Sequence, residues 1–458
     1  MKNLTMASIP QMIRENDIEA LKEALNVLSG FEIADMISHK TAEDQELIFS
    51  VLSPKLAAET FIYLSLKTQK RFLNSLPTMQ IADMLSAMPP DDRTALLQEL
   101  PRIVVEEYLK LLPTQERDLA LTLLGYPEGS VGRLMTTNYI AVRMDWTVEQ
   151  VLDHIRAYGR SSETINEIYV VDDKDILIDD IKIKEFLFVP KGYKVSQIAD
   201  KKFVALSTLD KADKAIETFK KYDRNALPVV NEDGVIQGIV TIDDILHLIS
   251  EKNTANIQKV GGTEALDEPY METPFFALMK KRAKWLVLLF VGEMFTATAL
   301  GFFEEEIAKA VVLALFLPLI ISSGGNAGSQ STTLIIRAVA LGEVKLKDWW
   351  KIMKREILSG IFLGAILGVI GFARIITWSA FTTIYGEHWF LVALTISLAL
   401  VGVVLWGSLI GSMLPLLLKR MRFDPAIASA PLVATLVDVT GIMIYFGIAM
   451  IVLKGSLL

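Results

Sequence analysis

Asp438 is the residue whose position suggests the most specific chemistry, because it lies near the middle of the apolar stretch Ala426–Leu453. A carboxylate at the centre of a lipid-spanning helix costs roughly 2.5 to 3.5 kcal/mol to insert, so it should face protein or water. Ala434, Ala430 and Gly441 share its helix face, and small side chains let another helix or a hydrated ion approach. Asp438 is then either an acid bonded to a neighbouring helix or an ion-path carboxylate, and we favour the second.

A second polar run interrupts another apolar segment, where residues 318–333 read PLIISSGGNAGSQSTT. Three glycines, a proline, amides and hydroxyls in such a place predict a locally loosened helix sheltered by protein or water. Its freed carbonyls would line an ion path together with Asn326 and Gln330. The alternative is a helix-packing face of small residues, made by Gly324 and Gly328. Both interpretations can hold together.

Composition narrows the classes of ligand and partner. The chain has no cysteine, which excludes disulfides, thiolate metal sites and cysteine nucleophiles, and its four histidines lie outside the expected spans. An ion inside the membrane would therefore be held by oxygen ligands, as hard cations such as Mg2+, Ca2+ or Mn2+ are. Residues 1–268 carry a net charge of −13 and residues 269–458 one of +5. The acidic half argues against nucleic acid as a partner.

We find no nucleophile elbow, Walker loop or histidine metal cluster, so we do not expect an enzyme. The first residues, MKNLTMASIPQMIREN, lack an apolar signal region, so we expect the soluble half to stay in the cytoplasm.

Residues 18–124 contain a repeat with a period of 24 residues. Such a repeat predicts paired short helices stacked into an α-superhelix. The acids of the repeat, and the Asp91-Asp92 pair, suit helix N-termini electrostatically, and on this pattern we favour that interpretation over a metal site. The repeated positions are residues 33–35, 57–59, 81–83 and 105–107, and the leucines Leu52, Leu76, Leu100 and Leu124.

Beyond residue 129 the pattern changes to short β-branched runs that alternate with helical patterns. Residues 167–171, 226–230 and 235–241 are predicted strands, with a turn at 231–234. The LPVV, DG and GIVTIDD elements resemble the second copy of a tandem pair of CBS modules. The first copy is degenerate, because LIDDIKIKEF replaces a Gly-hydrophobic-hydrophobic-Ser/Thr run.

CBS pairs often bind adenine nucleotides through a Thr and an Asp three residues later. The resemblance therefore makes Thr241 and Asp244 candidate ligands of the ribose of ATP or of another adenine nucleotide. Asp243 and Asp244 equally suit the N-terminus of a helix.

Five hydrophobic spans follow a helix expected from Ile245 to Val260. Basic residues collect before the first span and in the second-to-third and fourth-to-fifth loops, whereas acids occupy the other loops. The positive-inside rule then predicts a multi-pass protein of the cell (inner) membrane, with cytoplasmic N-terminal domains and the C-terminus outside. The spans are Trp285–Phe303, Ile307–Leu341, Ile357–Trp378, Phe390–Leu418 and Ala426–Leu453.

Three runs together resemble the MgtE family of magnesium channels, over nearly the whole chain: GGTEALDEPY to KKRAKWLVLLFVGE, PLIISSGGNAGSQSTTLIIRAVALGE, and DPAIASAPLVATLVDVTGIMIYF. The resemblance implies a multidomain protein. Its parts would be an all-α superhelical domain (1–128), an α/β tandem CBS domain (129–244), a connecting plug helix (245–268) and a five-span α transmembrane pore domain (269–458).

The resemblance also implies a homodimer in membrane lipid, whose pore lies on the two-fold axis and is formed largely by the second and fifth spans. Asp438 matches the family's pore acid, and Ala434 and Ala430 would supply backbone oxygens. Glu293 is either structural or pore-lining. The candidate ligands of the divalent cation are Asp438, Ala434, Ala430 and Asn326. The candidate pore-lining residues are Gly324, Gly325, Gln330, Glu293 and Gly441.

In that family, intracellular Mg2+ bridges acids of the cytoplasmic domains and the plug helix, and closes the pore. Here Lys252, Ala255 and Asn256 stand where the plug helix usually carries acids, so we expect weaker or altered gating by Mg2+. The candidate regulatory ligands are Glu59, Asp91, Asp92, Asp223, Asp244 and Glu251.

Two other functions stay open on the sequence. One is a proton- or sodium-coupled carrier of divalent cations that uses the same Asp438. The other is a non-conducting membrane sensor, against which Asp438 speaks, because an anchor needs no buried acid. The pattern does not choose among Mg2+, Mn2+, Co2+ and Ca2+.

Overall fold

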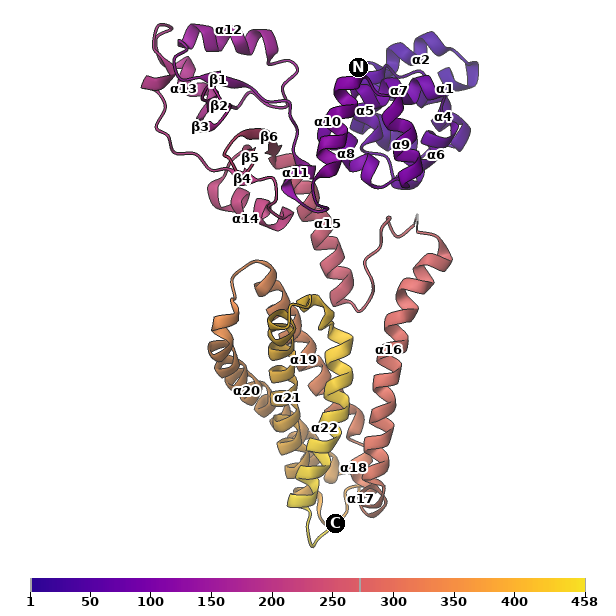
Figure 1. The fold of residues 1–458 in the computed structure, drawn as a ribbon. Coiled ribbons are helices and arrows are strands. Elements are labelled where there is room, and N and C mark those ends of the chain that lie inside the picture. The colour runs from indigo at the N-terminus through magenta and orange to yellow at the C-terminus, as the bar shows by residue number, and fades with distance from the viewer. Residues whose placement is uncertain (1, 272, 458) are drawn as a thin grey trace. The chain divides into compact units, whose positions relative to one another are not determined.

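The computed structural model describes residues 2–271 and 273–457. The chain divides into two compact units, one up to Ser250 and one from Glu251 onward. The first combines helices with two small sheets, and the second is a bundle of long helices (Figure 1).

The first unit begins with a stack of short helices. Helices α3, α5, α7 and α9 start 24 residues apart, and so do the helices that alternate with them. The hydroxyls of Ser29, Ser53 and Ser65 cap the starts of α3, α5 and α6. The helices are α1 (Lys2–Glu15), α2 (Ile18–Leu25), α3 (Gly30–Ser38), α4 (Ala42–Ser50), α5 (Pro54–Phe61), α6 (Leu66–Ser75), α7 (Thr78–Ala87), α8 (Pro90–Gln98), α9 (Arg102–Leu111) and α10 (Thr114–Gly125). The helical repeat is confirmed.

The prediction that the repeated acids lie at helix N-termini was wrong. Asp35, Glu59 and Asp83 each stand sixth in their helices and face solvent, far from the first turn. Serine hydroxyls and prolines occupy the helix starts instead, so no carboxylate is needed there. The expectation is correct for Asp91 and Asp92, which lie in the first turn of α8.

Two sheets of the same design follow. In each, the first strand runs parallel to the second, and the second runs antiparallel to the third. The strands are β1 (Ala141–Arg143), β2 (Glu167–Val171) and β3 (Leu177–Lys182) in one sheet, and β4 (Leu206–Ser207), β5 (Ala226–Val230) and β6 (Ile236–Thr241) in the other. The associated helices are α11 (Val131–Leu134), α12 (Val148–Tyr158), α13 (Ile183–Leu187) and α14 (Ala212–Tyr222), with a 3-10 turn η1 (Val195–Gln197).

The registers of the two sheets match position by position. Glu167 pairs with Lys182 in the first sheet as Ala226 pairs with Thr241 in the second. The degenerate sequence of the first copy therefore keeps the fold of the second. Apolar residues of both sheets share one core cluster, which contains Tyr169 from β2 and Ile239 from β6.

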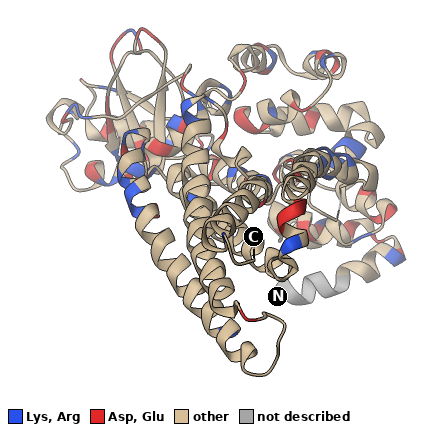
Figure 2. Ribbon diagram, turned by 90° about the horizontal axis from the view of Figure 1, so that it is seen from below, with Lys and Arg blue, Asp and Glu red and all other residues tan. Residues whose placement is uncertain are grey.

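A helix longer than predicted, α15 (Ile242–Val260), begins directly after β6. Beyond it, the described residues of the second unit include five helices that are long and apolar enough to span a membrane, as expected. They are α16 (Phe275–Phe302), α19 (Leu317–Ala340), α20 (Trp349–Ser379), α21 (Trp389–Arg420) and α22 (Ala430–Val452), joined in part by α17 (Glu304–Lys309), α18 (Val311–Ala314), η2 (Leu346–Asp348) and η3 (Pro425–Ile427). Figure 2 shows few charged residues along their middles.

The expected loosening of the glycine-rich run was wrong, because residues 318–333 lie within the continuous helix α19. The chain breaks earlier, around Ala310 and between α18 and α19. The glycines serve packing instead. A Cβ added to Gly328 would lie 3.1 Å from the carbonyl oxygen of Gly407 on α21, and Thr332 donates a 2.9 Å hydrogen bond to the carbonyl of Gly411. The alternative interpretation, a small-residue packing face, is confirmed.

Candidate functional site

Asp438 lies in the first half of α22 and is half-buried. A Cβ added to Gly325 of α19 would lie 3.6 Å from Oδ1 of Asp438 and 3.5 Å from Cβ of Ala434. The acid and Ala434, one turn earlier, therefore both face the glycine of α19. The carboxylate points toward neighbouring helices, and the absence of a side chain at Gly325 leaves space beside it.

Ala430 begins α22, one turn before Ala434. Its carbonyl oxygen accepts a 3.3 Å hydrogen bond from the hydroxyl of Ser329 on α19. Ser429, just before it, caps the helix by accepting from the N–H of Leu432. Backbone oxygens at this end of α22 are thus fixed against α19.

Helix α19 carries an exposed polar stripe. Ser322, Asn326 and Gln330 follow one another at intervals of four residues, so they share one helix face, and all three are exposed in the single chain. The amide of Asn326 donates to the hydroxyl of Ser322 at 3.4 Å. Amides are costly when they face lipid, so this stripe requires water or protein against it.

The other glycines near the acid have a different role. Added Cβ atoms at Gly324 and Gly441 would both press on side-chain atoms of Val403 on α21. These two positions permit close packing of helices, whereas Gly325 faces Asp438.

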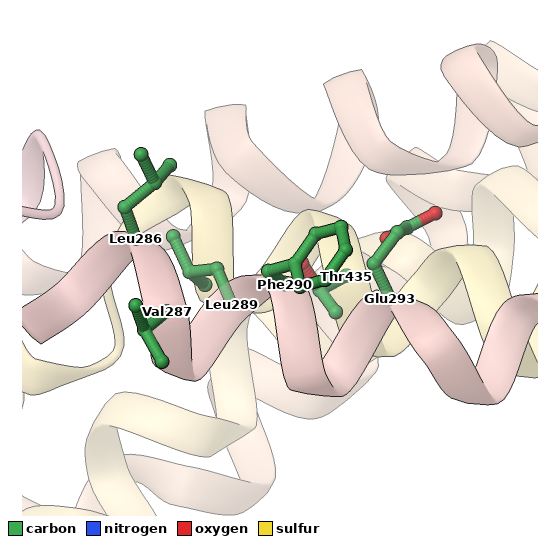
Figure 3. Close-up of a pocket in the computed structure, with 6 residues that line it drawn as sticks. All are labelled: Leu286, Val287, Leu289, Phe290, Glu293 and Thr435. Carbon is green, nitrogen blue, oxygen red and sulfur yellow. The ribbon is translucent and has the colours of Figure 1, made fainter. Parts of the chain in front are cut away.

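Glu293 lies on α16, exposed in the single chain and within electrostatic range of Asp438. It borders an open cleft of about 490 Å3 between α16 and α22. Figure 3 shows Glu293 and Thr435 at one end of this cleft, with Leu286, Val287, Leu289 and Phe290 along α16. The cleft is apolar apart from this end.

One acid of the membrane unit escaped the sequence reasoning. Glu356 in α20 accepts a 2.8 Å hydrogen bond from the hydroxyl of the buried Ser331 of α19. Its position after five basic residues made it look like part of a loop.

Contacts also tie the end of α15 to the start of α22. The ammonium group of Lys259 lies 2.7 Å from a carboxylate oxygen of Asp424, which caps η3. The indole N–H of Trp285 donates to the hydroxyl of Ser429 at 3.2 Å. A cavity of about 370 Å3 is lined by Lys259, Asp424 and Trp285 among others.

In the first unit, acids from α8, from the start of α15 and from a loop of the first CBS copy repel one another. Asp91 is buried, and its Oδ1 has no hydrogen-bond partner among the described residues. Burial, then the charges of Asp244 and Asp92, raise the pKa of Asp91 well above its usual value. Burial and the charge of Asp244 raise the pKa of Asp92 to about 7.

Glu163 was missed by the sequence reasoning, since it stands alone in a loop. Burial and the charges of Asp243 and Asp244 raise the pKa of its carboxyl group. We call Asp91, Asp92, Glu163, Asp243 and Asp244 the acid cluster.

The other regulatory candidates lie elsewhere. Glu59 is exposed and pairs with Lys55 at 3.8 Å, Asp223 is the exposed C-cap of α14, and Glu251 is exposed in α15. For the nucleotide candidates, the hydroxyl of Thr241 donates a 2.8 Å hydrogen bond to Oδ2 of Asp244.

No three acid or histidine side chains in residues 2–271 and 273–457 are arranged to hold a metal ion directly. The acid cluster is therefore an electrostatic feature. It suits a cation that is held mainly through its own water, as Mg2+ usually is.

Three family descriptions match the chain. Residues 317–448 match MgtE, "Divalent cation transporter", residues 28–129 match the "MgtE intracellular N domain", and residues 131–189 and 195–251 match the CBS domain.

The chain is 32% identical to "Magnesium transporter MgtE" of Thermus thermophilus, over 99% of this chain and 100% of the relative. It is 26% identical to the protein of that name from Bacillus subtilis, over 96% and 95%. A solved cytosolic domain of the Mg2+ channel MgtE in complex with ATP matches with a TM-score of 0.51 and 30% identity, over 53% of this chain and 99% of that one. With its five spanning helices, soluble N-terminal domains and full-length likeness to these relatives, the chain belongs to the MgtE family of divalent cation transporters.

Proposed function

We propose that this protein carries Mg2+ across the membrane through a passage beside Asp438, in a homodimer regulated by its cytoplasmic N-terminal and CBS domains. The observation that carries the proposal is the half-buried carboxylate of Asp438, which faces Gly325 inside a membrane-spanning bundle. A relative named a magnesium transporter matches along its whole length, which supports Mg2+ as the cargo.

The chemistry of Mg2+ suits these residues. Mg2+ dehydrates reluctantly and is usually held by one or two carboxylates while it keeps several waters. Two copies of Asp438, with Ala434 and Ala430 beside them, would grip the hydrated ion by charge and by the size of its water shell. The side-chain oxygen of Asn326 would extend the polar lining.

The polar stripe on α19 supports the second copy. The stripe, made of Ser322, Asn326 and Gln330, is exposed on a helix that is otherwise mostly apolar. Polar side chains are unfavourable in lipid. A second chain packed across a wet passage would cover this stripe. The same copy would place Glu293 at the protein interface instead of in lipid.

The test is Mg2+ uptake into liposomes by the native chain, Asp438→Asn and Asp438→Ala. We expect both variants to lose most of the flux, because either removes the charge that attracts the ion. Glu305→Gln, an exposed acid of α17, is the matched control and should keep native flux. Native flux in both Asp438 variants would refute the pore-acid role.

The same assay separates the alternatives. A channel conducts down the Mg2+ gradient alone, whereas a coupled carrier requires an imposed proton or sodium gradient. A sensor that only anchors CBS modules would show no flux at all. Competition by Mn2+, Co2+ and Ca2+ in the same liposomes ranks the cations.

For regulation, we propose that cytoplasmic Mg2+ binds at the acid cluster. Asp91, Asp92 and Asp244 repel one another and one oxygen of Asp91 lacks a partner among the described residues, so a hydrated cation would relieve the repulsion. Among the described residues, Glu59 and Asp223 make no hydrogen bond or ion pair with the acid cluster, and we propose them and Glu251 only as additional ligands. Because the plug helix carries Lys252, Ala255 and Asn256, we expect shallow inhibition by cytoplasmic Mg2+. Steep closure at millimolar cytoplasmic Mg2+ would contradict this.

Adenine nucleotide is a further proposed ligand of the CBS pair, supported by the relative solved in complex with ATP. Thr241 and Asp244 already hydrogen-bond to each other, so a ribose would have to share or break that bond. Isothermal titration of ATP into the full-length protein and into Thr241→Val tests this site. Equal affinity in both would remove Thr241 from it.

We propose that the domains divide near residues 128, 244 and 268, and that the chain lies in the cell (inner) membrane with its C-terminus outside. The basic residues of the loops before α20 and before α22 support this orientation. Labelling of a cysteine introduced at Ser456 by a membrane-impermeant reagent, in cells, tests it.

A further inference from the structure

The degenerate motif of the first CBS copy creates a buried group of charged residues. The matched registers place Asp179 where the second copy has Gly238, and Asp180 where it has Ile239. Two carboxylates thus replace a glycine and an apolar side chain. Neither is used by the proposed transport or by the acid cluster.

Strand geometry gathers further polar groups around Asp180. Tyr169 pairs directly with Asp180 across β2 and β3, and Glu167 lies two residues before Tyr169, so all three side chains share one face of the sheet. Tyr169 belongs to the apolar cluster that includes Ala226 and Ile239 of the second copy. This face is therefore the seam between the two CBS modules.

A single guanidinium reaches this group. Asp223 ends α14 in the left-handed conformation, with φ of 49°, and the chain then turns toward β5. The next residue, Arg224, places Nη2 3.3 Å from Oδ1 of Asp180. We call Glu167, Tyr169, Asp179, Asp180 and Arg224 the seam cluster.

Burial leaves several of its atoms without partners. Glu167 is 1%, Tyr169 0% and Asp180 7% exposed. Oε2 of Glu167, the hydroxyl of Tyr169 and Oδ2 of Asp180 have no hydrogen-bond partner among the described residues. An unpaired buried polar atom is costly, so the two carboxyl oxygens of this seam lack at least one hydrogen-bond donor.

Counting charges identifies what is missing. Both carboxyl oxygens of Asp179 have donors, because Oδ1 accepts from the N–H of Asp180 and Oδ2 from the N–H of Lys201. Glu167 and Asp180 share the one positive charge of Arg224, which leaves one negative charge in excess on this pair, and the carboxyl group of Asp179 adds to the repulsion at Asp180. Lys182, opposite Glu167, is exposed, so water screens its charge.

We propose that the seam cluster is a proton-binding site, in which one proton held by the carboxyl groups of Glu167 and Asp180 completes the contact between the two CBS modules and is lost as the pH rises. A proton suits this place better than a metal ion. The guanidinium of Arg224 already occupies one oxygen of Asp180, and no three acids of the described chain form a metal site.

The electrostatics agree. Burial raises the pKa of Asp180 to about 6 against the partial compensation by Arg224, and burial also raises the pKa of Glu167. The hydroxyl of Tyr169 stays protonated, since burial and the two acids raise its pKa further. Tyr139, whose ring meets that of Tyr169 edge-on at 5.9 Å, has a pKa raised by burial to about 12.

The direction of the pH effect follows from linkage. A carboxyl group with a raised folded pKa stabilises the packed state below its unfolded pKa, and this contribution disappears as the pH rises through the folded value. For Asp180 the two values are 3.8 and about 6. A shift of two units changes the packing equilibrium of the seam on the order of a hundredfold.

The experiment is hydrogen exchange of the full-length protein in lipid nanodiscs between pH 5 and pH 8, corrected for the intrinsic pH dependence of exchange. We expect the protection of β2, β3, β5 and β6 to fall tenfold or more across this range in the native protein. Asp180→Asn, which imitates the protonated acid in shape, should remove most of this change. Asp173→Asn, an exposed acid of the nearby turn, should leave it intact.

A second variant, Glu167→Gln, removes the other carboxyl group that is proposed to hold the proton. It tests the proposal if Asp180→Asn does not fold. A native seam whose protection is constant from pH 5 to pH 8 would overturn the proposal. So would an unchanged pH dependence in whichever of the two variants folds.

Discussion

Substitution of Gly411 by alanine tests the close packing of α19 against α21. Gly411 lies on α21, where its Cα meets the backbone of Gly328 on α19. An added Cβ would overlap the carbonyl oxygen of Gly328, and it would lie 2.9 Å from the carbonyl carbon and 3.0 Å from the Cα of that residue, whereas ordinary contacts begin at 3.4 Å. The two helices would therefore have to separate by more than half an ångström, because backbone atoms cannot rotate away.

The expected cost follows from two opposing effects. Over-packing of a tight contact costs about 1 to 3 kcal/mol, whereas alanine in place of glycine inside a helix recovers about 0.5 to 1 kcal/mol. The two ranges leave a net loss of about 0 to 2.5 kcal/mol. Because the added Cβ would overlap a backbone oxygen, we expect the upper part of this range, about 1.5 to 2.5 kcal/mol, which for a unit of this size lowers the melting temperature by about 3 to 10 °C.

Thermal unfolding in detergent, with the folded fraction at each temperature measured by size-exclusion chromatography, gives this loss. The matched control is Gly447→Ala on α22, where an added Cβ meets no atom of the described residues within 4 Å. We expect the control to be as stable as the native chain or slightly more so. If Gly411→Ala melts together with Gly447→Ala, the interpretation of the glycines as a packing face is wrong.

Three further predictions concern the sites. Gly325→Ala should fold normally, because its methyl group would lie at an ordinary contact distance, 3.6 Å from Oδ1 of Asp438. The same methyl group would fill the space beside the carboxylate, so we expect Mg2+ uptake into liposomes to fall severalfold. Unchanged uptake would place the passage elsewhere. Arg93→Met should destabilise the helical repeat by about 2 kcal/mol, because it removes a buried guanidinium that bonds to Glu116 and to the carbonyl of Leu85. The loss is modest because Glu116, which is left without this partner, is partly exposed. Faster hydrogen exchange in α8 to α10 would measure it. The pKa of Asp92 is raised to about 7, so the stability that its protonated form contributes is present at low pH and is lost as the pH rises through 7. Added Mg2+ should therefore protect the backbone of the acid cluster from hydrogen exchange more at pH 8 than at pH 6. Equal protection at both pH values would argue against a cation there.

Local patterns in the sequence predicted most of the architecture. The period of 24 residues gave the helix pairs, because each repeat packs its leucine, buried or partly buried, against the same core. The five spans followed from length and hydropathy, since a bilayer tolerates only apolar segments of that length. The resemblance to the MgtE family likewise rested on motifs that the sequence displays directly, and the comparisons confirm it.

What the sequence could not decide depends on contacts between distant residues. The glycines at 324 and 328 were compatible with a loosened helix or with close packing, and the choice was made by Gly407 and Gly411, some eighty residues away. Glu163 joined the acid cluster only because folding brings its loop near Asp244. Composition shows which charges a chain has, but only tertiary structure decides which of them are buried together, and burial is what turns a carboxyl group into a site for a cation or a proton.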